Sequence, residues 1–263
     1  MSNKINYADL KGYKQIRSYK LFEPPIGKGA VGVVYKAWDS KRNQLAAIKS
    51  ISSKLLSDEQ RMRCFQNEVK ALHYLKHDNI IKIYSVEKTI NNIYIALEFA
   101  NGGTLNELLR YYKNKYNSGI PEPLVQRIIQ QLLSGLEYMH EKKHMHRDLK
   151  LDNILLHFND NYERDNFVEY EKSGFDGMQI KIADLGYAKN IEGTDLASTL
   201  CGTPITMPPE VVQNHLERNF ERGYNAKADL WSLGALTYEM LVSQPPFNGY
   251  NIDDLFKNIS KGV

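Results

Sequence analysis

The sequence predicts an α+β protein with two lobes, a small strand-rich lobe that contains one helix and a larger, mostly helical lobe. Two observations support this. The first hundred residues contain short runs rich in Val, Ile, Tyr and Ala, whereas apolar residues after residue 120 recur at helical spacing. The polar segment Asn101-Gly102-Gly103 separates the two patterns. We therefore expect an N-terminal lobe over residues 1–100 and a C-terminal lobe over residues 101–263.

The N-terminal lobe is expected to hold several short strands and one helix. A helix is predicted over residues 58–76, where apolar side chains recur at helical spacing behind Ser57 as the N-cap. The predicted strands cover residues 31–38, 44–51, 80–86 and 92–99.

Two apolar helices dominate the expected C-terminal lobe. Residues 121–140 begin with a proline and carry a wide apolar stripe, and residues 226–243 have a similar composition. Residues 153–157 and 179–183 resemble strands, and residues 252–259 resemble a helix.

The segment between the two C-terminal strands fits neither lobe. Residues 158–178 contain six acidic residues against two basic ones. Segments so rich in charge tend to remain solvated, which favours a loop insertion. An acidic docking surface is the alternative interpretation.

Composition excludes several classes of protein. The net charge of +3, from 34 basic and 31 acidic residues, does not favour nucleic acid or membrane surfaces as partners. Cys64 and Cys201 stand far apart, so neither a disulfide framework nor a zinc site is expected. The N-terminal residues are polar and do not show the apolar core of a signal peptide, and no apolar run reaches membrane-spanning length. We expect a cytoplasmic protein without membrane insertion, and the oligomeric state is left open.

A glycine-rich segment, Gly27-Lys-Gly29-Ala-Val-Gly32, precedes the first predicted strand. Glycines at this spacing let backbone amides approach phosphate oxygens that a Cβ atom would keep away. A strand follows rather than a helix, which argues against a dinucleotide-binding fold. A glycine-rich hairpin without a ligand is an equally good interpretation of this segment alone.

Two charged residues fall in apolar surroundings. Lys49 ends the strand Ala46-Ala47-Ile48, and Glu68 lies next to the apolar stripe of the predicted helix. A buried charge is costly unless it is paired, so an ion pair between them would explain both. Alternatively, Lys49 extends along the surface with its ammonium group in water.

The strongest local pattern is His144-Met-His146-Arg147-Asp148-Leu-Lys150-Leu-Asp152-Asn153. A charged cluster between a buried helix and a strand is costly without a function. It contains a carboxylate, a cation and an amide oxygen, as phosphoryl transfer requires. Asp184 follows a later apolar strand and precedes Gly186. Such an acid often ends a strand in a turn, but its place after Asn153 indicates a second metal ligand instead.

Together these motifs resemble the eukaryotic protein kinases over residues 20–263, in the order that this family requires. The resemblance implies a two-lobed protein-kinase-like fold, ATP and Mg²⁺ as cofactors, and protein substrates. By resemblance, Gly27, Gly29 and Gly32 cover the phosphates, and Lys49, oriented by Glu68, holds the α- and β-phosphates.

The resemblance also assigns the other roles. Asp148 accepts the proton of the substrate hydroxyl, Lys150 neutralises the transferred group, and Asn153 and Asp184 hold magnesium. Leu97 is the gatekeeper. The other positions implied to contact the adenine or its edge are Ile26, Val34, Ala47, Glu98, Ala100 and Leu155.

Lys150 beside the base, with Gly202-Thr203-Pro204 later, is similar to serine/threonine kinases. The segments 181–189 and 198–204 resemble those of the autophagy-initiating kinases. Arg147 beside Asp148 indicates control by the activation loop, where a phosphate on Thr199, or alternatively Ser198, would pair with Arg147. A regulatory partner is a further hypothesis.

Several positions depart from the family pattern. Leu185 replaces the usual Phe, Pro208 replaces Ala, and Thr206 replaces Tyr. The chain stops at Val263, before the final helices and the arginine that pairs with Glu210 in the family, so we expect a C-terminally truncated domain of reduced stability. The leading hypothesis is an active kinase, and the alternative is a pseudokinase or another nucleotide-binding interaction module.

Overall fold

The structure is a computed structural model that describes residues 14–29, 32–158, 167–185, 189–190, 204–216 and 226–262. The chain forms two compact units. The N-terminal unit consists of Met1–Gln66 and Ile81–Ala100, and the C-terminal unit of Asn67–Ile80 and Asn101–Val263. The predicted α+β class is confirmed, because the first unit is built on an antiparallel sheet and the second mostly on helices. The lobe boundary at residue 100 stays a prediction.

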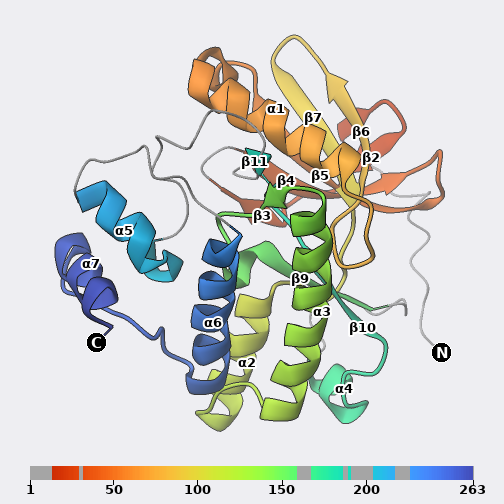
Figure 1. Ribbon diagram of the computed structural model, residues 1–263. Helices are drawn as coiled ribbons and strands as arrows, with labels where there is room; N and C mark the ends of the chain where they lie inside the picture. Colours follow the sequence, from red (N-terminus) through yellow and green to blue (C-terminus); the bar gives the residue numbers. More distant parts are fainter. Residues whose placement is uncertain are drawn as a thin grey trace. The chain divides into compact units, whose positions relative to one another are not determined.

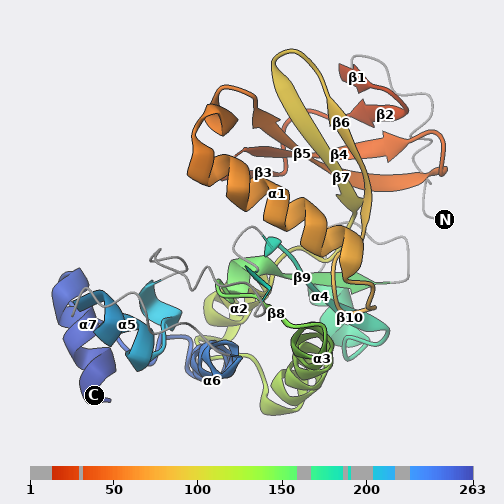
Figure 2. The same ribbon diagram turned by 45° about the horizontal axis from the view of Figure 1, so that its top comes forward.

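The N-terminal unit contains a seven-stranded antiparallel sheet in the order β1-β2-β4-β5-β7-β6, with β3 paired to β4. Figure 2 shows the long hairpin formed by β6 and β7. The predicted strand at 80–86 begins later, because Ile80 instead forms a bridge with Ile182. The strands are β1 (Lys14–Ile16), β2 (Tyr19–Leu21), β3 (Gly27–Lys28), β4 (Val33–Asp39), β5 (Gln44–Ser52), β6 (Ile83–Lys88) and β7 (Asn92–Glu98).

One face of this sheet carries its own apolar core. Side chains alternate between the two faces of a strand, so every second residue joins the core. The buried members of this cluster are Tyr19, Leu21, Ala37, Ala46, Ile48, Tyr94 and Ala96.

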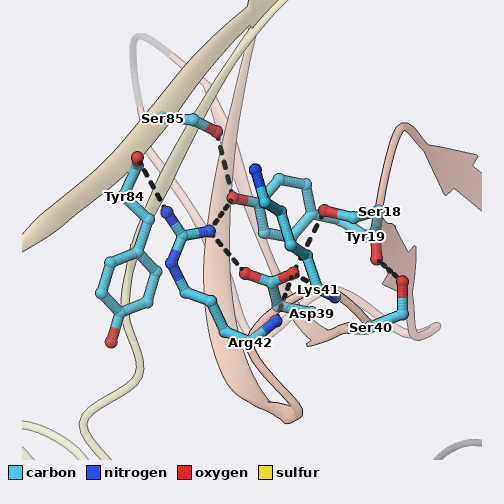
Figure 3. Close-up of polar contacts among 8 residues, drawn as sticks. All are labelled: Ser18, Tyr19, Asp39, Ser40, Lys41, Arg42, Tyr84 and Ser85. Atoms are coloured by element: carbon cyan, nitrogen blue, oxygen red, sulfur yellow. Dashed lines mark hydrogen bonds and ion pairs between the residues drawn. The ribbon is translucent and has the colours of Figure 1, made fainter.

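A buried carboxylate stabilises the turn between β4 and β5. Asp39 is fully buried, and its Oδ2 accepts a hydrogen bond from Nη1 of Arg42 at 2.8 Å. Its Oδ1 accepts from the hydroxyl of Ser18 at 3.1 Å and from the backbone N–H of Lys41 at 3.0 Å. Figure 3 shows that Arg42 also reaches Tyr19, so one network ties β2 to this turn. Burial alone would raise the pKa of Asp39, but these hydrogen bonds lower it overall.

Three of the four long helices in the described residues were predicted from the spacing of apolar residues. The predicted helices at 58–76, 121–140 and 226–243 correspond to α1, α3 and α6. Helix α2 was not predicted, and a capping box between Thr104 and Glu107 begins it. Figure 1 shows α6 beside α3. The bounds are α1 (Glu59–Tyr74), α2 (Leu105–Tyr116), α3 (Glu122–Glu141) and α6 (Lys227–Val242).

Two shorter helices form a separate apolar cluster in the C-terminal unit. Helix α5 (Pro209–Leu216) packs against α7 (Ile252–Lys261), which extends the predicted 252–259 helix by two residues. Their shared core contains Met207, Val211, Val212, Phe256 and Ile259.

The short strands of the C-terminal unit form two pairs. The predicted strands at 153–157 and 179–183 correspond to β9 (Ile154–Phe158) and β10 (Met178–Ile182), which pair antiparallel as a hairpin. The second pair is β8 (His144–Met145) with β11 (Lys189–Asn190).

The expectation of a solvated loop over residues 158–178 is wrong for its described part. Residues Phe167–Lys172 form helix α4, and Tyr170 and Phe175 are buried. The ring of Tyr170 stacks on Phe158 at 3.6 Å between centroids. Aromatic residues among the acids therefore anchor the segment, because burying their area outweighs the tendency of the acids to stay in water. Residues 159–166 lie outside the described part of the chain.

None of the helices in the described part of the chain combines the length and apolar character that a membrane span requires.

Candidate active site

The glycine-rich segment forms a hairpin in the N-terminal unit. Gly27 pairs with Val34 across β3 and β4, and the N–H of Gly29 donates to the carbonyl of Gly32 at 2.9 Å. The N–H of Ile26 donates to the carbonyl of Val34 at 2.8 Å. A Cβ atom at Gly32 would collide with the carbonyl of Ser50, so a larger residue cannot take this place without a shift of the backbone. Residues 30 and 31, at the tip, lie outside the described part.

The strand residues predicted to contact ATP share one face of the sheet. Val34 lies opposite Lys49, and Ala47 lies opposite Leu97. Directly opposed residues of antiparallel strands point to the same face, as do residues two apart on one strand. These four therefore occupy the face opposite the apolar core of the N-terminal unit. The N–H of Glu98 donates to the carbonyl of Lys82 at 2.8 Å, so any adenine bond from Glu98 must use its carbonyl. Ala100 is buried at the end of this unit.

The structure brings three predicted catalytic residues together in the C-terminal unit. Asp148 is buried, and its Oδ2 accepts hydrogen bonds from Nζ of Lys150 at 2.8 Å and from Nδ2 of Asn153 at 3.1 Å. Nδ2 of Asn153 also donates to the backbone carbonyl of Asp148 at 2.8 Å. Burial alone would lower the pKa of Lys150, but Asp148 raises it overall, so the ammonium group stays charged.

A buried aspartate on α6 holds the backbone of this loop. Asp229 accepts hydrogen bonds from the backbone N–H groups of His146 at 3.0 Å and Arg147 at 2.9 Å, and lies 2.7 Å from Nε2 of His140. Burial would raise the pKa of Asp229. The hydrogen bond from His140, the charge of His146 and the two backbone N–H groups of the loop lower this pKa overall. Arg147 has a φ angle of 71°, a strained value for a residue with a side chain.

Asp229 and His140 were not among the predicted site residues. The signal that could have found them is an acid within an otherwise apolar helix pattern, because a buried charge needs partners.

Asp184 lies next to the same loop. It follows β10, is exposed, and has a φ angle of 59°. The N–H of Ala183 donates to the carbonyl of Asn153 at 2.9 Å, and the carbonyl of Ala183 lies 3.0 Å from Nε2 of His146. The charge of Asp184 also contributes to the raised pKa of Lys150, after the larger effects of burial and Asp148. Leu155, the predicted adenine contact of this unit, is half-buried on β9.

The donor set near Asp184 fits a hard divalent cation. Asn153 donates both amide hydrogens to Asp148, so Oδ1 is the acceptor that it can present to a metal. The described residues contain no group of three His, Cys, Asp or Glu side chains that could hold a metal by themselves. Mg²⁺ suits such a site, since it is usually bound by one or two carboxylates together with substrate phosphates.

Other predicted residues remain untested. Lys49 and Glu68 belong to different units, so their ion pair stays a prediction, although Glu68 is buried. Thr199 and Ser198 lie outside the described residues, as do Gly186 and the segment 201–203. Leu185, at the first departure from the family pattern, is fully buried, as expected for an apolar replacement of Phe.

These two sets of residues, one in each unit, define a class of enzyme. One unit presents a glycine hairpin and a strand lysine, the other a buried Asp–Lys–Asn cluster beside an exposed aspartate, which are the parts of a phosphoryl-transfer enzyme with a two-lobed kinase fold. The chain belongs to the protein kinase domain family, whose model matches residues 21–263. Members of this family use ATP and a divalent metal to phosphorylate proteins.

Several curated kinases are similar to the chain. Serine/threonine-protein kinase ATG1 of Debaryomyces hansenii is 34% identical over 90% of this chain and 28% of its own length. Serine/threonine-protein kinase ULK1 of Homo sapiens is 34% identical over 88% of this chain and 20% of its own length. Serine/threonine-protein kinase ATG1a of Arabidopsis thaliana is 34% identical over 90% of this chain and 33% of its own length. The chain therefore spans a third or less of the length of these relatives.

Proposed function

We propose that this chain is the catalytic domain of a serine/threonine protein kinase that uses Mg²⁺ and ATP. The observation that carries the proposal is the arrangement around Asp148. Its buried carboxylate accepts hydrogen bonds from Lys150 and Asn153, so that a proton acceptor, a cation and a metal-binding amide lie within one short loop. The names of the relatives support the choice of serine and threonine over tyrosine.

Each residue has a defined task in the proposed reaction. Asp148 orients the substrate hydroxyl and accepts its proton, and Lys150 neutralises charge on the transferred phosphoryl group. Asn153 and Asp184 would hold the metal, which when bound neutralises charge on the phosphate oxygens. Catalysis then rests on positioning and electrostatics, because the protein forms no covalent bond to the phosphoryl group. The N-terminal unit would bind the nucleotide through Lys49 and the glycine hairpin.

Arg147 supports a further part of the proposal, control by phosphorylation. It immediately precedes Asp148, and its backbone is fixed by Asp229. A phosphate on Thr199, or on Ser198, would pair with the Arg147 guanidinium and order the activation loop. Treatment of the wild-type chain with a phosphatase should then lower its activity. The Thr199→Ala variant should have low activity from the start, and the phosphatase should not lower that activity further. Full activity of a double variant that carries both Thr199→Ala and Ser198→Ala would contradict control by phosphorylation.

The resemblance to the autophagy-initiating kinases extends the proposal from the reaction to the location and partners of the enzyme in the cell. It suggests a cytoplasmic kinase with protein substrates and a regulatory partner.

The main test compares phosphoryl transfer from radiolabelled ATP to a generic protein substrate by the wild-type chain and by Asp148→Asn. Removal of the proton acceptor should lower the rate by roughly 10²–10⁴-fold. Asp176→Asn is the matched control, because this exposed side chain accepts a hydrogen bond from the adjacent Gly177 and lies outside the loop. Equal transfer by wild type and Asp148→Asn would trace the signal to a contaminating kinase. Binding of Mg·ATP without any transfer would favour the pseudokinase alternative.

A further inference from the structure

One acid of the insertion is bound to three side chains of helix α2. Oε2 of Glu171, on α4, accepts hydrogen bonds from the hydroxyl of Tyr111 at 2.8 Å, the hydroxyl of Tyr116 at 2.9 Å and Nζ of Lys115 at 2.7 Å. Burial would raise the pKa of Glu171, but these three donors lower it overall, so the carboxylate stays ionised. Helix α4 is therefore docked on the C-terminal half of α2 by a charge-assisted network.

A second contact fixes the turn that follows α4. The guanidinium of Arg127, on α3, donates to the carbonyl of Gly174 at 2.7 Å and to the carbonyl of Phe175 at 2.7 Å. Gly174 and Phe175 both have positive φ angles, of 64° and 56°, a conformation that is unfavourable for Phe175 without such support. Side chains of α2 and α3 thus both bind the described part of the insertion.

The insertion closes one end of a hairpin whose other end carries the proposed metal ligands. Asn153 immediately precedes β9, and Asp184 lies two residues after β10. At the closed end, Phe158 stacks on Tyr170 and exchanges two hydrogen bonds with the side chain of Asn101, at 2.8 and 3.0 Å. The strands of the hairpin are also held along their length, by the side chain of Gln131 on α3 and by the backbone of Gly102 and Gly103. The contacts at the closed end complete the set that fixes its position, because a two-stranded hairpin is only marginally stable by itself.

We propose that the insertion is a positioning element for the metal–nucleotide site: Glu171 and Arg127 fix the closed end of the β9–β10 hairpin and thereby place Asn153 and Asp184 at its open end. Glu171 and Arg127 touch neither substrate nor metal, and act through the hairpin. This inference rests on the proposed function, because it assigns Asn153 and Asp184 to a bound metal.

The test is the affinity of the purified chain for Mg·ADP, measured by calorimetry beside its melting temperature. Glu171→Ala should weaken Mg·ADP binding on the order of tenfold, the scale seen for residues that orient metal ligands. The binding of ADP in the presence of EDTA should change much less. Glu169→Ala is the matched control, since it removes the same charge from an exposed position of the same helix and should leave both affinities unchanged.

A purely structural role predicts another result. Glu171→Ala would then lower the melting temperature but leave the Mg·ADP affinity of the folded protein at the wild-type value, which overturns the inference. If Glu171→Ala does not fold, Tyr116→Phe and Arg127→Lys remove parts of the same contacts and should each give a smaller loss of Mg·ADP affinity. An unchanged affinity in both variants also overturns it. Failure of the wild-type chain to bind Mg·ADP would instead refute the proposed function.

Discussion

The side-chain amide of Asn153 donates hydrogen bonds to both the backbone carbonyl and the carboxylate of Asp148, at 2.8 and 3.1 Å. The proposed metal ligand and the proposed proton acceptor are therefore one polar unit. Because both amide hydrogens are engaged, the orientation of the Asn153 oxygen is fixed before a metal binds.

Replacement of Asn153 by alanine tests this relationship. The variant removes two hydrogen bonds, each contributing about 0.5–1.5 kcal/mol, and deprives the buried Asp148 carboxylate of a donor. We expect a lower unfolding free energy together with a higher Mg²⁺ concentration for half-maximal ADP binding. Urea denaturation and a magnesium titration measure the two effects. A variant that loses stability but keeps the wild-type magnesium dependence would contradict the assignment of Asn153 as a metal ligand.

Asp229→Asn should destabilise the chain more strongly. Asp229 accepts from two backbone N–H groups, and an asparagine would turn an NH₂ group toward one of these donors. An unsatisfied buried donor costs about 1–3 kcal/mol, and the lost charge weakens the remaining bonds. Because the pKa of Asp229 is lowered, its stabilisation is present above the ordinary value of 3.8 and is lost as the pH falls through the folded-state pKa.

Chemical denaturation at pH 7 and at pH 3 measures this effect, with Glu137→Gln on the exposed side of α3 as a control. A difference between Asp229→Asn and wild type that is equally large at both pH values would show that charge is not the cause.

Gly102 should not tolerate a side chain. A Cβ atom there would lie 2.6 Å from Cε2 of Phe158 and 2.7 Å from Cβ of Leu156. Overpacking of this kind costs about 1–3 kcal/mol, so Gly102→Ala should lower the melting temperature of the chain. Gly234→Ala is the matched control, because no described atom lies within 4 Å of a Cβ built at this helical position. This second variant should gain roughly 0.5–1 kcal/mol from helix propensity. Equal melting temperatures for the two variants would be inconsistent with the packing at Gly102.

Asp39→Asn should weaken the N-terminal unit in a pH-dependent way. The carboxylate accepts from Arg42, Lys41 and Ser18, and its pKa is lowered. Its contribution is therefore fully present above the ordinary pKa of 3.8 and disappears as the pH drops through the folded-state value. We expect a loss of about 1–3 kcal/mol near neutral pH and a smaller loss in acid. Hydrogen exchange of the β4 and β5 amides measures the local effect, and unchanged protection in this hairpin would rule out the predicted role.

Glu239→Gln should stabilise the chain, in contrast to Asp39→Asn. Burial, and then the charge of Asp152, raise the pKa of Glu239, so its ionisation opposes folding. The wild-type chain loses stability relative to the variant as the pH rises from 4.5, the ordinary value, through the folded-state pKa. The melting temperature of Glu239→Gln should therefore exceed that of wild type at pH 8 and match it at pH 4. Asp152→Asn in the Glu239→Gln background should add less stability than in wild type, since the repulsion is already gone.

Helices α1, α3 and α6 could be predicted from the sequence because their apolar residues recur over several turns, whereas α2 was not predicted. The helix predicted over residues 121–140 is Glu122–Glu141, and that over 226–243 is Lys227–Val242. Helix α4 has only six residues, and a helix this short has no stability of its own. Its order comes from the burial of Tyr170 and the binding of Glu171 by α2, which no local pattern contains.

The candidate site likewise contains some contacts that the sequence predicts and others that it does not. The contacts among Asp148, Lys150 and Asn153 lie within six residues, so their proximity follows from the motif itself. The role of Asp229 depends on contacts 82 and 83 residues away, which spacing alone cannot show. The pairing of Lys49 with Glu68 stays a prediction, because it joins residues of different units.

The bonds from Asp229 to His146 and Arg147 also impose an order of events during synthesis. A ribosome releases the chain from its N-terminus, so the loop with Asp148 emerges about eighty residues before the carboxylate that holds it. Until α6 has left the exit tunnel, nothing in the described chain can secure those two backbone N–H groups in the same way. A nascent chain therefore gains its phosphoryl-transfer geometry late, after the residues proposed to bind the nucleotide have already been made.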